Sequence, residues 1–113
     1  MREVTPHAVL EVLSRHIGSE AGLSVWQLGR AVTGSAPSSA AERSVRHAIE
    51  ELRRRGHHIC AHPSTGYHIA ADDAELTRTC EYLYSRAMCS LEQVAAMRRV
   101  SLPDLRGQLR IPS

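Results

Sequence analysis

Arginine, with serine and histidine beside it, offers the clearest chemistry in this sequence. Arg43 and Arg46 lie three residues apart. Ser44 directly follows Arg43, and His47 directly follows Arg46. On a helix, this spacing places the side chains on one side. A guanidinium group is a planar fork that pairs with phosphate oxygens or with the edge of a guanine. The pattern therefore indicates either a surface that binds a large anion or an ordinary solvated charged face.

A second group of chemically versatile side chains follows, consisting of His57, His58, Cys60, His62 and His68. Imidazole and thiolate groups are the ligands that zinc prefers. The usual spacings of zinc ligands are absent, however, and alternating residues on a flat strand face do not converge on a tetrahedron. We therefore predict no metal site and no cofactor.

Catalytic groupings are not recognisable in the sequence. The acidic residues are scattered, no glycine-rich phosphate loop is present, and no serine, histidine and acid occur in a supporting motif. We expect that the protein is not an enzyme.

The composition suits one small folded domain with a further element. The chain has 113 residues, and its hydrophobic share of 42% argues against wholesale disorder. The formal net charge of +2 permits nucleic-acid binding without arguing for it. Three widely spaced cysteines, no apolar run of membrane length and no signal sequence predict a cytoplasmic protein without a membrane partner.

The stretch from Ser39 to Gly56 must position the arginines. Ser39 and Glu42 have the spacing of a capping box, which predicts that a helix starts at Ser39. Gly56 predicts a left-handed stop. The stretch therefore predicts a helix over 39–55 with an apolar stripe opposite the arginines. This stripe consists of Val45, Ala48, Ile49 and Leu52.

The remaining pattern predicts a mainly α fold with a small β-hairpin. Further helices are expected over 5–17, 24–33 and 72–98, and the alternation around the Pro63 to Gly66 turn predicts an antiparallel hairpin over 58–70. Thr5, Ser24 and Asp72 are the expected caps, with Glu75 completing a capping box. Ser90 also has a cap pattern, so the last helix either continues through it or breaks there.

The order of three helices and a hairpin resembles the winged helix-turn-helix of the biotin-operon-repressor type. The resemblance is carried by Arg43 to Leu52, by Arg55-Gly56-His57-His58-Ile59 and by Gly66-Tyr67-His68-Ile69. It covers roughly residues 5 to 70. More loosely, the long helix and the tail that begins Ser101-Leu102-Pro103 look like small winged-helix proteins of phage and prophage genomes.

This resemblance implies a winged-helix domain over 1–70 and a long helix and tail over 71–113. It also implies a small transcriptional regulator that binds double-stranded DNA and is nucleoid-associated when bound. The helix over 39–55 would enter the major groove. The DNA contacts expected from it are Ser39, Arg43, Ser44, Arg46, His47 and Arg54. The wing would contribute His62, Ser64, Thr65 and His68, although a hairpin that merely covers the core fits the sequence equally well.

The helix over 72–98 has more apolar surface than one small core absorbs. We expect a homodimer that buries Leu83, Met88, Leu91 and Val94. The alternative is a fold-back of residues 91–100 with Leu102, Leu105 and Leu109. A second functional hypothesis is an interaction module that docks on a host or phage replication or regulatory protein.

Overall fold

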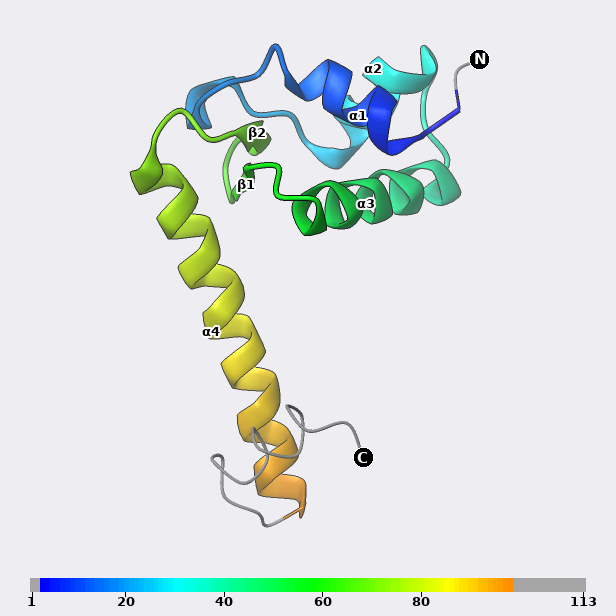
Figure 1. The fold of residues 1–113 in the computed structure, drawn as a ribbon. Helices are drawn as coiled ribbons and strands as arrows, with labels where there is room; N and C mark the ends of the chain where they lie inside the picture. Colours follow the sequence, from blue (N-terminus) through cyan, green and yellow to red (C-terminus); the bar gives the residue numbers. More distant parts are fainter. Residues whose placement is uncertain (1–2, 99–113) are drawn as a thin grey trace. The chain divides into compact units, whose positions relative to one another are not determined.

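The computed structural model describes residues 3–98, which confirm a mainly helical chain with a small antiparallel hairpin and a long last helix (Figure 1). The chain divides into two compact units, one up to Thr79 and one from Cys80 onward. The expectations for Leu102, Leu105 and Leu109 lie outside the described residues.

The first unit is built from α1 (Pro6–Leu13), α2 (Val25–Thr33) and α3 (Ser39–Arg54), and α1 and α2 both pack on α3 (Figure 1). The apolar stripes of these helices meet β1 in one core. Its buried members are Ala8, Val9, Val12, Leu13, Leu28, Val32, Val45, Ala48, Ile49, Leu52 and Ile59. The predicted stripe of α3 is therefore confirmed as its buried face.

Two of the three helix starts in this unit follow the sequence signals. Thr5 accepts a hydrogen bond from the Ala8 amide, and Ser24 forms a reciprocal capping box with Gln27. The predicted cap at Ser39 is wrong. Ser38 has the extended backbone that a cap needs and accepts from the Ala41 amide at 3.1 Å. With the cap one residue earlier, Glu42 falls out of phase for a capping box.

The first helix is shorter than predicted, since α1 ends at Leu13 instead of continuing to residue 17. The backbone there leaves the helix to pair with β2. The Ile69 amide donates to the His16 carbonyl and the Gly18 amide donates to the Ile69 carbonyl, both at 2.8 Å. Ile17, which the prediction placed in this helix, consequently lies outside it and is 60% exposed.

The predicted hairpin is confirmed as β1 (Ile59–His62) and β2 (Gly66–Ile69), with Cys60 opposite His68. The second edge of β2 is also bonded. It pairs with the segment around the short 3₁₀ helix η1 (Ser19–Ala21), where Leu23 and Tyr67 exchange two backbone hydrogen bonds. Sequence reasoning missed this added pairing.

The last helix, α4 (Asp73–Arg98), runs unbroken through Ser90, so the break considered there does not occur. Asp72 accepts from the Glu75 amide at 2.9 Å, which confirms it as the cap. Within the described part of α4, Thr79 is the one buried residue. No helix in residues 3–98 combines the length and apolar character needed to cross a bilayer.

Candidate nucleic-acid interface

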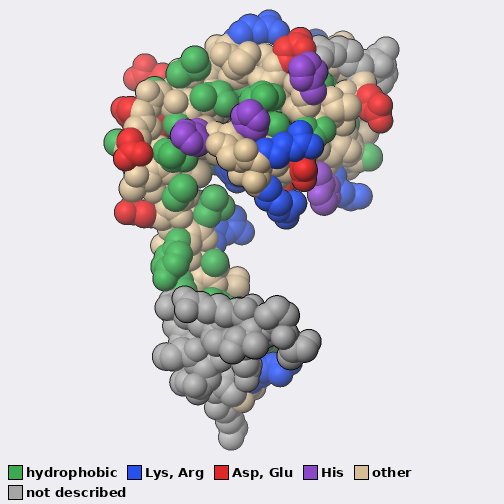
Figure 2. All heavy atoms as spheres, in the orientation of Figure 1, with side chains coloured by type: hydrophobic (Ala, Val, Ile, Leu, Met, Phe, Trp, Pro, Cys, Tyr) green, Lys and Arg blue, Asp and Glu red, His purple; other side chains and the backbone are tan. Residues whose placement is uncertain are grey.

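The outward face of α3 gathers the residues expected to bind DNA. All six of these side chains are exposed, on the sides of the helix away from the core. They are Ser39, Arg43, Ser44, Arg46, His47 and Arg54. Arginine side chains follow this part of the first unit, with acidic and histidine side chains between them (Figure 2). The surface is therefore basic but mixed in charge.

The arginines of α3 and its C-terminal cap fall into two groups, those that have a partner within the chain and those that have none. The half-buried Arg53 turns inward, and its Nε donates to the Ile59 carbonyl at 2.8 Å. Arg55 pairs with Glu51 at 3.2 Å. No hydrogen bond or ion pair within residues 3–98 engages the guanidinium groups of Arg43, Arg46 and Arg54. Among the arginines of α3, these three are available to an anionic ligand.

A shallow groove of about 390 Å³ runs between α3 and the start of α1. Three of the expected contact residues, Ser44, His47 and Arg54, line it beside Val4 and Pro6. Arg43, Arg46 and Ser39 are not part of it. The contribution of the chain start was missed, because no signal in α3 itself points to residues forty positions earlier.

Acidic side chains also belong to the outward face of α3: Glu51, the partner of Arg55, lines the groove beside Ser44 and Arg54, and Glu50 lies next to His47. The Glu50 carboxylate lies 4.0 Å from His47 Nδ1, and both side chains are more than half exposed. Such an exposed pair contributes little to stability. Its effect is to place a negative charge among the free arginines, which disfavours a purely phosphate-directed surface.

The expected wing residues separate in the structure. His62 and Ser64 are exposed at the hairpin turn, where the Ser64 amide donates to His62 Nδ1. Thr65 is half-buried and donates its hydroxyl to the Ser19 carbonyl. His68 is only 2% exposed, so the prediction that it offers its side chain at the wing surface is wrong. The first turn of α4 covers this side of the hairpin, because Glu75 reaches it.

Glu75 connects the start of α4 to the η1 segment and to β2. The sequence predicted only a helix-capping role for this residue. Its carboxylate accepts from the amides of Ala71 at 2.9 Å and Ser19 at 3.0 Å, and it lies 3.4 Å from His68 Nε2. It does not return to the Asp72 amide, so only half of the expected capping box forms. The Ala71 hydrogen bond, followed by that from Ser19, holds the pKa of Glu75 below its ordinary value.

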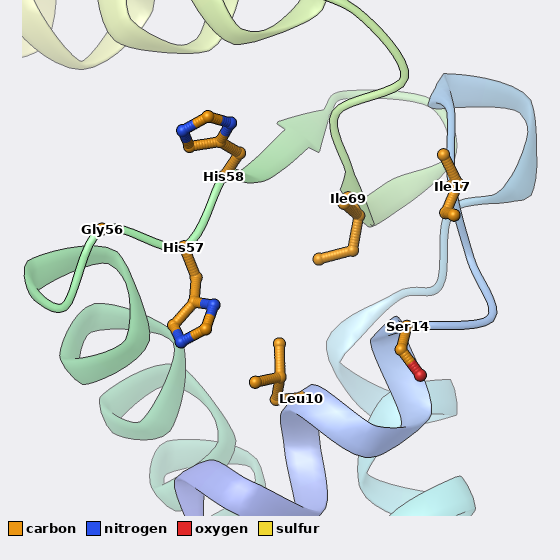
Figure 3. Close-up of a pocket in the computed structure, with 7 residues that line it drawn as sticks. All are labelled: Leu10, Ser14, Ile17, Gly56, His57, His58 and Ile69. Carbon is orange, nitrogen blue, oxygen red and sulfur yellow. The ribbon is translucent and has the colours of Figure 1, made fainter.

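A second groove, of about 440 Å³, lies on the same unit and is lined by Leu10, Ile17 and Ile69 together with His57 and His58. The two imidazole rings point in different directions (Figure 3). Across residues 3–98, no three histidine, cysteine or acidic side chains are placed to hold a metal ion. The histidines of this region therefore stay separate surface groups, apart from the buried His68.

Comparison of the chain with protein-family models, curated proteins and solved structures gave no match.

Proposed function

We propose that this chain is a DNA-binding protein of the winged helix-turn-helix type, with α3 as the recognition helix. The observation that carries the proposal is the free trio of Arg43, Arg46 and Arg54 on a helix whose opposite face is fixed in the core. A rigid helix with cations on its outer side is the usual means of reading the major groove. A small transcriptional regulator of phage or prophage type, acting on the nucleoid, fits this role.

The proposed division of labour follows from side-chain chemistry. Arg43 and Arg46 contact guanine edges, because a guanidinium pairs bidentately with O6 and N7. Ser39, Ser44 and Arg54 contact phosphates, which fix the position of α3 on the duplex. Because Arg54 is the one arginine of α3 that this division places on a phosphate, the logarithm of the binding constant should fall with the logarithm of salt concentration at a slope of about −1 per chain.

The test is a gel-shift titration of genomic fragments with the double variant Arg43→Ala, Arg46→Ala. We expect specific affinity to fall by about 100-fold or more, since each bidentate guanine contact is worth about 1–3 kcal/mol. The matched control, Arg15→Ala with Arg30→Ala, removes the same charge from exposed positions outside α3 and should keep sequence preference. Equal, salt-insensitive binding by the α3 variant and the wild type would contradict the proposal.

A protein-docking module is the second candidate. It is favoured by the exposed apolar and aromatic side chains of α4, where Tyr82 is 58%, Leu83 42% and Tyr84 62% exposed. Aromatic residues are enriched at protein interfaces. This alternative predicts no sequence-specific DNA binding by the folded chain, together with α4-dependent binding to a host or phage replication or regulatory protein.

A further inference from the structure

The part of α4 after Thr79 has a regular seam along one side. Its members are alternately four and three residues apart, namely Cys80, Tyr84, Ala87, Leu91, Val94 and Arg98. This spacing aligns side chains along a helix and is the repeat of two helices that pack along their length. Leu83 and Met97 flank the seam on one side, and Met88 and Ala95 flank it on the other.

Apart from Arg98 at its end, the seam and its flanks are apolar, and none of these side chains is buried. Tyr84 is 62% exposed, Leu83 42% and Met97 77%, while Leu91 and Val94 are half-buried. The opposite side of the helix carries exposed Ser85, Cys89 and Gln93, and also Tyr82, whose ring lies under the Arg86 guanidinium group. A continuous row of exposed apolar side chains is typical of an interaction surface.

We propose that this seam pairs with the same seam of a second copy, with the two helices antiparallel and the two-fold axis at the level of Cys89. In this register Ala87 faces Leu91 of the second copy, and Tyr84 faces Val94. Each contact sets a smaller side chain against a larger one, which suits close packing. The two-fold axis makes every contact occur twice.

Charge and exposure agree with the same register. Arg98 faces Cys80 of the second copy, where the neighbouring Glu81 supplies an opposite charge. Leu83 faces Met97, so these two exposed apolar side chains cover each other. The contact of Arg98 with Cys80 and Glu81 and the contact of Leu83 with Met97 both follow from the same position of the two-fold axis.

The parallel arrangement of the same seam is less favourable. It places Arg98 against Arg98, a like-charge contact at the helix end. It also places Ala87 against Ala87, which leaves a gap between the helices. Tyr84 then packs against Tyr84 in the next layer, which is crowded. The seam therefore fits a second copy of the chain in the antiparallel orientation. This pairing involves none of the proposed DNA contacts on α3.

Thiol cross-linking of the full chain with a short bis-maleimide distinguishes the arrangements. In a Cys89→Ser background, Cys80 would lie about 27 Å along the helix axis from its copy in the antiparallel pair, so no covalent dimer should form. Ser90→Cys, combined with Cys80→Ser, lies next to the two-fold axis and should cross-link readily. Ser85→Cys in the same background faces away and serves as the control. Rapid cross-linking through Cys80 would overturn the antiparallel pair.

Light scattering supplies the matching mass measurement. The wild type in reducing buffer should have the mass of a dimer at concentrations of tens of micromolar. Leu91→Glu with Val94→Glu should weaken association more than 100-fold and leave a folded monomer. A wild type that is already monomeric, with a double variant that melts at lower temperature, would overturn the proposal and assign the seam to residues 99–113 of the same chain.

A charge exchange tests the register itself. Glu81→Arg should weaken the dimer by a few-fold, and adding Arg98→Glu should restore it, because the two positions meet only across the antiparallel interface. In a parallel dimer these positions lie about 25 Å apart along the axis, and the second change would give no recovery. Additive effects of the two changes would therefore refute the register.

Discussion

Helix α3 and the part of α4 beyond Thr79 both carry apolar residues at helical spacing, but the polar and apolar faces are much more sharply separated in α3, and the surroundings of the two helices differ. In α3 the stripe residues Val45, Ala48, Ile49 and Leu52 are all buried. In the described part of α4, Thr79 is the last buried residue, and the apolar seam stays accessible. Helical periodicity thus predicts which face is apolar, whereas elements distant in sequence determine whether that face is covered.

The largest difference should appear when a leucine is shortened in each helix. Leu52 is 1% exposed, so Leu52→Ala should lower the free energy of unfolding by about 2–5 kcal/mol. Leu91→Ala removes a half-buried side chain and should cost less than about 1 kcal/mol at concentrations where the chain is monomeric.

Urea titration followed by the circular dichroism of the helices measures both variants, because α3 and α4 both contribute to the signal. The fluorescence of Trp26, the single tryptophan, follows the first unit separately, since Trp26 belongs to α2. If Leu52→Ala and Leu91→Ala lowered the free energy of unfolding by comparable amounts, the apolar stripes of α3 and α4 would not differ in burial as described.

An intermediate effect is expected where α4 begins, because its first turn is held by Glu75. The folded-state pKa of this carboxyl is lowered from about 4.5, so its contribution to stability is fully present above that pH and is lost as the pH falls through the folded value. Glu75→Gln should therefore be less stable than the wild type at pH 7, and the difference should shrink below about pH 4.5.

Thermal melts of both proteins across pH 3 to 7 measure this convergence. The other carboxyl groups are common to both proteins and cancel in the difference. A constant difference between the wild type and Glu75→Gln at every pH would show that the Ala71 and Ser19 hydrogen bonds do not depend on the carboxylate charge.

The smallest effect concerns the first residue of α3. Ser38→Ala should cost about 1 kcal/mol, because it removes the acceptor for the Ala41 amide. Ser39→Ala changes an exposed position already inside the helix and should stay within about 0.5 kcal/mol. Chemical denaturation of the two variants compares their free energies of unfolding directly. A larger decrease for Ser39→Ala than for Ser38→Ala would indicate that Ser39 is the cap, as first expected.

The sequence predicted those features that depend on neighbouring residues. The cap at Ser24, the stop at Gly56 and the antiparallel hairpin around its turn all involve groups a few positions apart. The exposed side of α3 followed in the same way, since it is the side opposite the apolar stripe. These signals are local and act before distant segments meet.

The errors have the opposite origin. Ile17 leaves the helix because it pairs with Ile69, and His68 is buried because Glu75 lies over it. Each of these outcomes depends on a partner that periodicity along one element does not reveal.

The parallel bridge between Ile17 and Ile69 also has a mechanical consequence. It joins a residue near the chain start to one that follows α2, α3 and β1, so these elements lie inside the loop that it closes. A force that pulls the two chain ends apart loads a parallel bridge in shear, together with the hydrogen bond from Ser19 to Glu75. Under tension, α3 is thereby shielded until these bonds break.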